Sequence, residues 1–180
     1  MESRSERARL AVPVGKRDHV RGPASAEVTL VEYGDFECPY TRMARPGVRR
    51  LRRDFGDRLL FAFRAFPLTR IHPHAQAAAE AAEAAAAQGR YWEMHDLLFD
   101  NQWHLEDEDL RRYAGRLGLD LERFDRELTE HAHAHRVHED VTSGLMSGVR
   151  GTPTFFVNGL RHDGPYDLAA LRAAVEQAAR

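Results

Sequence analysis

Two near-continuous apolar runs, separated by a stretch of helical periodicity, dominate the first third of the chain. Residues 28–33 and 59–66 are rich in valine, leucine and aromatic side chains, which is typical of strands buried on both faces. Residues 39–54 between them have a helical pattern, which Pro46 should bend or break. Strand, helix and strand at this spacing predict a βαβ unit with parallel strands and a right-handed crossover.

The middle of the chain alternates polar and apolar residues at helical spacing and predicts a block of five helices. Its large aromatic residues are most simply explained as core between these helices: Tyr91, Trp92, Phe99 and Trp103. The predicted helices cover residues 74–88, 91–102, 106–117, 120–128 and 134–147.

The last third of the chain predicts a hairpin followed by a helix. Residues 154–157 and 160–162 are short strands joined by Asn158-Gly159, a strong hairpin signal, and residues 168–179 form the final helix. This order is the layout of the thioredoxin fold, an α/β class in which βαβ and ββα halves surround a central mixed sheet, here with a helical insertion. The pattern alone leaves an unrelated α/β domain open.

The predicted domain organisation follows from these elements. We expect an extended N-terminal arm over residues 1–25 and a thioredoxin-like domain over residues 26–70 and 148–180. The helical block, residues 71–147, is the expected inserted subdomain.

Composition narrows the possible partners. The chain has 180 residues, of which 43% are hydrophobic and 30% charged, and its formal net charge is −2, so nothing attracts it globally to nucleic acid or to an anionic membrane. No apolar run reaches the ~18 residues of a membrane span. The polar start, residues 1–9, lacks the apolar core of a secretory signal. We therefore expect a cytoplasmic protein, and the sequence does not fix its oligomeric state.

Cys38 is the only cysteine, and its position favours reactivity. It follows a Gly34-Asp35 turn and stands where the first helix should begin, so backbone N–H groups and the helix dipole favour thiolate over thiol. One cysteine excludes an intrachain disulfide, and Thr41 occupies the position of the second thiol in a Cys-x-x-Cys motif. We expect the Cys38 sulfur to be reachable from solvent; an inert, buried small hydrophobe is the alternative.

Four separated segments resemble, in order, the DsbA-like family of thioredoxin-fold oxidoreductases. The resemblance runs from about Asp18 to the C-terminus. It implies a reactive thiol at Cys38, while Thr41 departs from the dithiol pattern. The segments are VEYGDFECPY (31–40), FRAFPL (63–68) followed by His72-Pro73, YWEMHDLL (91–98) and GVRGTPTFFVNG (148–159).

The resemblance assigns roles to further residues. It implies that Pro153 is preceded by a cis peptide bond and lies opposite Cys38, with the Thr152 backbone free to pair with an extended substrate. Glu32 resembles the buried acid that relays protons to the active-site thiols of this fold; a buried carboxyl there should be protonated or linked to water. Pro39 pre-sets the start of the helix, and Tyr40 offers an apolar contact surface.

These residues predict a monothiol disulfide oxidoreductase. Cys38 would exchange mixed disulfides, with Thr41 donating its hydroxyl to the thiolate and an external small thiol of the glutathione type releasing the adduct. The expected partners are disulfide-containing proteins or small-thiol mixed disulfides, and no tightly bound cofactor is expected. Two alternatives stay open: a redox-silent module that binds peptides or proteins, and a single-cysteine redox sensor.

The histidines invite a metal interpretation that the sequence does not complete. His131, His135 and His138 share one helical face, but no cysteine or carboxylate is visibly placed to finish a zinc site, so we expect no metal and a solvated polar face. His72 and His74 follow the second predicted strand, where we expect them to border the substrate groove without being catalytic.

Overall fold

The computed structural model describes residues 8–180, so the first seven residues of the predicted arm, with most of the polar start, lie outside the described part. The chain divides into two compact units. The sheet unit contains the described residues up to Tyr33, Met43–Arg64 and Ser143–Arg180, and the helical unit contains Gly34–Arg42 and Ala65–Thr142. This division differs from the predicted one chiefly because the segment that carries Cys38 groups with the helical unit.

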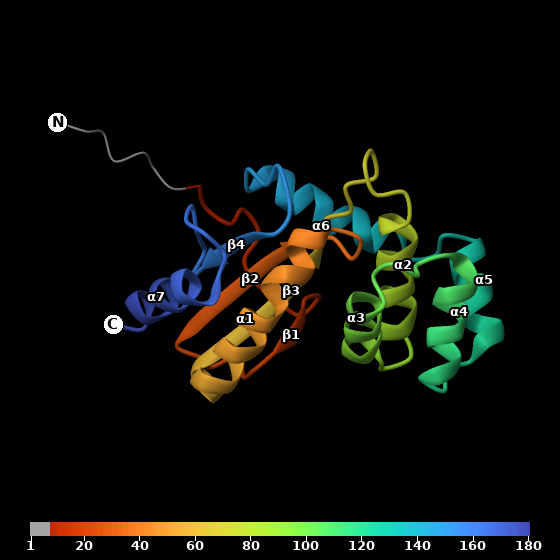
Figure 1. The fold of residues 1–180 in the computed structure, drawn as a ribbon, viewed down its shortest axis with the longest axis horizontal. Coiled ribbons are helices and arrows are strands. Elements are labelled where there is room, and N and C mark those ends of the chain that lie inside the picture. The colour runs from red at the N-terminus through yellow and green to blue at the C-terminus, as the bar shows by residue number, and fades with distance from the viewer. Residues whose placement is uncertain (1–7) are drawn as a thin grey trace. The chain divides into compact units, whose positions relative to one another are not determined.

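A five-stranded mixed sheet forms the centre of the sheet unit (Figure 1). The strand order is β1-β3-β2-β4-β5, and the pairs β1–β3, β2–β4 and β4–β5 are antiparallel. The central neighbours β2 and β3 are connected through a helix, as the predicted βαβ unit requires. The strands are β1 (His19–Arg21), β2 (Val28–Gly34), β3 (Leu59–Ala65), β4 (Thr154–Val157) and β5 (Leu160–Arg161).

The burial of the strands explains the apolar runs in the sequence. Every residue of β3 and all but one of β2 are buried, because these strands lie inside the sheet with a neighbour on each side. Tyr33 of β2 meets Phe156 of β4 edge to face, with ring centroids 5.8 Å apart. The predicted thioredoxin fold is therefore confirmed.

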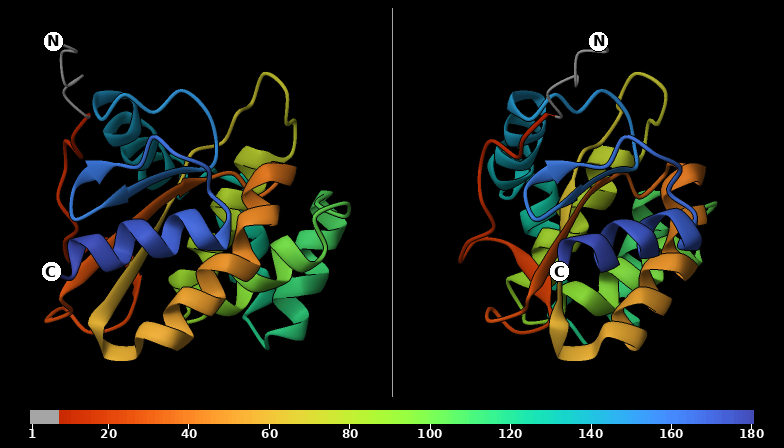
Figure 2. Two further views of the ribbon diagram at one scale, coloured as in Figure 1. Left: turned by 60° about the vertical axis from the view of Figure 1, so that its left-hand side comes forward. Right: turned by 90° about the vertical axis from the view of Figure 1, so that its left-hand side faces the viewer.

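Helices α1 (Pro39–Phe55) and α7 (Leu168–Ala178) lie side by side in the sheet unit (Figure 2). Arg172 of α7 pairs with Asp54 of α1 and places its guanidinium over the Phe55 ring. Helix α1 continues through Pro46, so of the two predicted effects of this proline a break does not occur, and a bend stays a prediction. A short 3-10 turn, η1 (Gly56–Arg58), leads from α1 into β3.

The helical unit is built around an alanine-rich helix. Nine residues of α2 are buried, seven of them alanines, and small side chains let α3, α4 and α5 pack closely against it. Tyr91 and Phe99 are buried as predicted, but Trp103 is 74% exposed because α3 ends at Asp100 and leaves it in the following turn. The helices are α2 (Ala75–Ala86), α3 (Tyr91–Asp100), α4 (Asp107–Arg116), α5 (Leu121–Thr129) and α6 (Ala134–Met146), of which α6 ends in the sheet unit.

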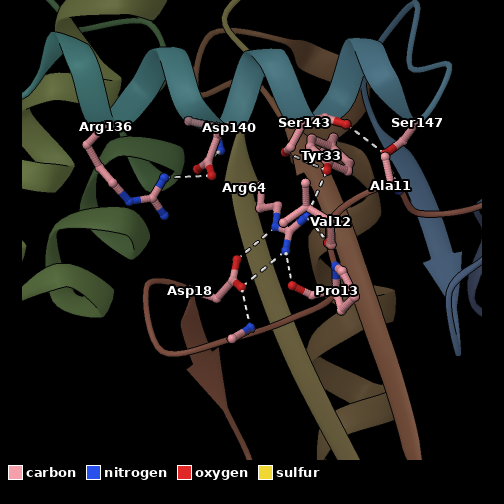
Figure 3. A network of polar contacts seen from close by, with 12 residues as sticks. Ala11, Val12, Pro13, Asp18, Tyr33, Arg64, Arg136, Asp140, Ser143 and Ser147 are labelled. Carbon is pink, nitrogen blue, oxygen red and sulfur yellow. Dashed lines mark hydrogen bonds and ion pairs between the residues drawn. The ribbon is translucent and has the colours of Figure 1, made fainter.

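A buried arginine ties the N-terminal arm to the sheet (Figure 3). The Arg64 guanidinium donates to both carboxylate oxygens of Asp18, at 2.7 and 3.1 Å, and to the Tyr33 hydroxyl at 2.9 Å. It also donates to the carbonyl oxygens of Val12 and Pro13. Arg64 and Asp18 have fully buried side chains, so this ion pair is shielded from solvent. We call Arg64, Asp18 and Tyr33 the arginine network.

Candidate redox site

Cys38 stands immediately before the first residue of α1. Its N–H donates to the Asp35 carbonyl at 3.1 Å, and its own carbonyl accepts the hydrogen bond of Arg42 N–H at 3.2 Å. Cys38 is thus the N-cap residue of α1, next to backbone N–H groups that have no partner inside the helix. The predicted position at a helix start agrees with the structure.

The Cys38 residue is only 2% exposed, so the expectation of a solvent-reachable thiol is wrong for this structure. The helical unit is closely packed near this residue. Phe36, 1% exposed, packs against Phe99 and His95 of α3, with ring centroids 5.0 and 5.7 Å away. Cys38 is therefore part of a packed region rather than of an open surface.

Asp35 organises the turn before Cys38. Its fully buried carboxylate accepts a hydrogen bond from Glu37 N–H at Oδ1, 2.7 Å, and one from Leu68 N–H at Oδ2, 2.8 Å. Oδ2 also lies 2.8 Å from His72 Nδ1. One side chain therefore connects the segment before α1 to the loop after β3. A carboxylate accepts such bonds strongly because it is charged.

Glu37 also connects the segment before α1 to the loop after β3. Its carboxylate accepts from the His74 N–H at 2.7 Å and contacts His74 Nδ1 at 2.9 Å, while His74 Nε2 lies 3.0 Å from Glu106. The hydrogen bond to Glu37 raises the pKa of His74, partly opposed by its loss of hydration. Only the imidazolium donates from both ring nitrogens, so the two carboxylates favour it. We call Asp35, Glu37, His72 and His74 the histidine cluster.

Gln102 reaches the backbone around Cys38 from the turn after α3. Its side-chain amide nitrogen lies 2.9 Å from the Phe36 carbonyl oxygen and 2.9 Å from that of Cys38. The residue is 3% exposed, and among the described residues its Oε1 has no hydrogen-bond partner. The sequence analysis missed Gln102, because one glutamine near a predicted helix end gives no signal.

The remaining residues predicted around the thiol are placed as follows. Thr41 is fully buried, and its hydroxyl oxygen accepts a long hydrogen bond, 3.4 Å, from Asp35 N–H, which leaves the hydroxyl hydrogen for another acceptor. Its predicted hydrogen bond to the Cys38 sulfur stays a prediction. Pro39 is the first residue of α1, and Tyr40 is 57% exposed, as a contact surface requires.

Glu32 lies in β2 of the sheet unit and is 2% exposed. Burial raises the pKa of this carboxyl to about 8, although the positive charge of Arg45 opposes the shift. The group is therefore protonated at neutral pH, in agreement with the expectation. Among the described residues, its Oε1 has no hydrogen-bond partner. Its role as a proton relay stays a prediction.

The Thr152–Pro153 peptide bond, in the sheet unit, is cis, which is the predicted isomer. It borders a hollow of about 400 Å³. Arg161 on its wall is held by Asp163 at 2.5 Å, whereas Arg150 has no partner among the described residues. Cys38 and Pro153 belong to different units, and the expectation that they face each other stays a prediction.

The histidines before and within α6 contact separate carboxylates. His131 lies 3.1 Å from Glu80, and His135 lies 3.5 Å from Glu139. Within residues 8–180, no group of three or more histidine, cysteine, aspartate or glutamate side chains could hold a metal ion.

Comparisons with known proteins identify the family. A family model described as thioredoxin matches residues 15–177. Among curated proteins, Na(+)/H(+) antiporter NhaA 3 of Salinispora tropica is 56% identical over 170 residues, which are 94% of this chain but 26% of that protein. NhaA 1 of Mycolicibacterium vanbaalenii is 49% identical over 166 residues, 91% of this chain and 27% of that protein.

The chain spans about a quarter of the length of these relatives, so the transport activity in their names describes proteins that are much longer. The helices in the described part of the chain are too short or too polar to cross a bilayer.

Several solved structures share the fold. The thioredoxin-like oxidoreductase from Silicibacter pomeroyi DSS-3 superposes with a TM-score of 0.80 at 28% identity, over 91% of this chain and 93% of that one. Oxidised BdbD from Bacillus subtilis gives 0.81 at 23% identity, over 96% and 98%. Wolbachia pipientis α-DsbA1 gives 0.76 at 20% identity, over 94% of each chain. The chain therefore belongs to the thioredoxin family and has the DsbA-like form of its fold.

Proposed function

We propose that this protein is a monothiol thiol-disulfide oxidoreductase in which Cys38 is the nucleophile. One observation carries the proposal: the only thiol of the chain is the N-cap residue of α1, in a thioredoxin-family chain. Free N–H groups at a helix start stabilise negative charge on such a sulfur, and the thiolate is the form that attacks disulfides.

The reaction proceeds in two balanced exchanges. In the first, the Cys38 thiolate attacks one sulfur of a mixed disulfide, a new Cys38–sulfur bond forms, the original sulfur–sulfur bond breaks, and the other sulfur leaves as thiolate. In the second, the thiolate of an external small thiol attacks the adduct, takes the bound group as a new disulfide and regenerates the Cys38 thiolate. Thr41 cannot perform this second attack, so the small thiol is an obligatory co-substrate.

Residues of both units supply contact surfaces in this proposal. In the sheet unit, the Thr152 backbone beside cis-Pro153 pairs with an extended disulfide-containing substrate. In the helical unit, Pro39 and the exposed Tyr40 offer the substrate a further contact surface. The hollow near Pro153 accepts the carboxylate of the small thiol through Arg150, because that guanidinium is exposed and not neutralised by a neighbour in the described chain.

Proton transfer completes the proposal. Glu32 is protonated at neutral pH and supplies a proton to the departing thiolate, while the Thr41 hydroxyl donates to the Cys38 thiolate between cycles. A supply of small thiols is available in the cytoplasm, which is the compartment we propose.

The deep burial of Cys38 favours a second candidate, a redox-silent module that binds peptides beside cis-Pro153. A thiol that never becomes accessible cannot exchange, whereas binding at Thr152 and Arg150 does not need it. The two functions differ in what happens when Cys38 is removed.

Reduction of a glutathionylated test peptide, measured with and without added glutathione, tests the proposal. We expect catalysis only with the small thiol present, and we expect Cys38→Ser to abolish turnover. Thr41→Cys supplies an internal resolving thiol, which should attack the Cys38 adduct and release the bound group as a thiol without added glutathione, leaving an intramolecular disulfide in the variant.

The outcomes separate the candidates. Turnover that survives Cys38→Ser contradicts the proposal. Unchanged peptide binding in Cys38→Ser, with no turnover in either protein, supports the binding module. One equivalent of adduct without turnover supports a stoichiometric redox sensor.

A further inference from the structure

Two glutamines of the helical unit make different use of their side-chain amides. Gln88 is satisfied at both ends by one residue: its nitrogen donates to the Asp120 carbonyl at 3.3 Å, and its oxygen accepts from Asp120 N–H at 2.8 Å. Gln102 uses only its nitrogen, on two carbonyls, and keeps a buried oxygen with no hydrogen-bond partner in the described chain. A structural amide is expected to resemble Gln88.

The orientation of the Gln102 amide is fixed by its partners. Rotating it by half a turn would place Oε1 against two carbonyl oxygens, which repel it, so the nitrogen must face Phe36 and Cys38. A buried acceptor without a donor is unfavourable, because it has lost its hydrogen bonds to water. Stability alone therefore gives a weak reason for glutamine at this position.

The two carbonyl groups that Gln102 binds belong to Cys38 itself and to Phe36, two residues before it. The Cys38 carbonyl also accepts the first hydrogen bond of α1, from Arg42 N–H, so the residue is fixed from the helical side and from the Gln102 side. The Phe36 carbonyl belongs to the turn that enters the helix. Fixing both ends sets the backbone angles of Cys38 and hence the direction of its side chain relative to the free N–H groups of the first turn.

We propose that Gln102 is a positioning residue for Cys38: its amide holds the thiol-bearing residue at the N-cap of α1, where the helix N–H groups stabilise the thiolate. This inference rests on the proposed function, in which the thiolate attacks. Gln102 acts through the backbone of Cys38, so it takes no part in bond exchange. The burial of the Gln102 side chain also keeps solvent from competing for the two carbonyls.

Alkylation of Cys38 by iodoacetamide tests this inference without requiring turnover. Gln102→Met removes both donors at similar volume, and Gln102→Glu keeps the shape but presents an acceptor to the two carbonyls. We expect each change to move the pH profile of the alkylation rate towards alkaline pH by about one unit, which corresponds to about 1.4 kcal/mol. The profile reports how well the thiolate is stabilised, whatever the change in access to the sulfur. Gln88→Met, the matched control, should leave the profile unchanged.

Two results would overturn the inference. One is an unchanged pH profile in the Gln102 variants; the other is a shift of the profile that Gln88→Met reproduces. Hydrogen exchange provides a readout that is independent of the sulfur. In Gln102→Met, the amide of Arg42 should exchange at least about tenfold faster than in Gln88→Met, and equal exchange in the two variants would contradict the positioning role.

If iodoacetamide does not react with Cys38 in the wild type, the proposed function is contradicted. Hydrogen exchange at the Arg42 amide still tests whether Gln102 positions Cys38, because it does not depend on the thiol.

Discussion

The arginine network and the histidine cluster fix two segments of the chain with opposite chemistry. The side chains of Arg64 and Asp18 are completely buried, and the guanidinium keeps its charge at any pH near neutrality. The histidine cluster instead combines carboxylates with imidazoles, and the His74 side chain is 34% exposed. The first holds the arm to the sheet; the second holds the turn before Cys38.

The difference shows where the molecule can respond to its surroundings. A buried arginine–carboxylate pair with extra hydrogen bonds either stays formed or leaves an uncompensated charge, so it acts as a fixed part of the fold. Histidine changes charge near neutral pH, so contacts made through it weaken gradually as the proton is lost. The segment that carries the proposed nucleophile is thus held by the adjustable set of contacts.

The largest expected effect comes from breaking the arginine network. Arg64→Met leaves the Asp18 carboxylate buried without its counter-charge, and we expect the free energy of unfolding to fall by about 3–5 kcal/mol. Urea denaturation measures it. Arg50→Met is the matched control, since Arg50 pairs with Asp54 at the surface, and it should cost less than about 1 kcal/mol. Equal losses in both variants would show that burial does not distinguish the two pairs.

A smaller effect is expected for Glu32, the buried carboxyl of the sheet unit. Burial raises its pKa to about 8 in the folded protein, from an ordinary value of 4.5, so the folded protein holds a proton that the unfolded chain releases. Stability should therefore fall as pH rises between these values, by at most about 1.4 kcal/mol per pH unit.

Glu32→Gln removes this dependence. The stability of the variant relative to wild type should increase by about 3 kcal/mol between pH 5 and pH 8, measured by denaturation at several pH values. Glu27→Gln, at an exposed ion pair with Arg58, should leave the slope unchanged. A wild-type curve that is flat over this range would rule out a raised pKa for Glu32.

The smallest expected effect concerns the histidine cluster. The raised pKa of His74 means that its contacts with Glu37 and Glu106 stabilise the fold fully below the unfolded pKa of about 6.5 and are lost as pH rises through the folded value. His74→Gln should lower stability by less than about 1 kcal/mol at pH 5.5 and by still less at pH 8.5. A penalty that grows with pH would reverse the assigned sign. His135→Gln, at an exposed pair, should show no such trend.

The sequence predicted the fold well because its strongest signals are local. Buried strands β2 and β3, the Asn158-Gly159 hairpin and the helical periods are each contained in short segments, and the structure has them within a few residues. The position of Cys38 at the start of α1 follows from the same kind of signal. Trp103 was misplaced because hydrophobic character alone does not reveal that a helix has ended three residues earlier.

The contacts around Cys38 could not be read from the sequence because they join residues far apart in the chain. Asp35 meets His72, Glu37 meets His74, and Gln102 meets Cys38 across separations of 37, 37 and 64 residues. Polar residues in a loop follow no periodic pattern from which such pairs could be predicted. The burial of Cys38 has the same origin, since packing from distant segments decides it.

The near-complete enclosure of Cys38 has a consequence for selectivity. Two copies of the protein cannot join through this sulfur by simple collision, because both would have to rearrange first. Purified protein should accordingly keep a free thiol in air for longer than proteins with surface cysteines do. A docked partner that loosens the surrounding turn would expose the sulfur only in the complex with that partner. Binding of the correct partner, rather than random collision, would then control disulfide exchange at Cys38.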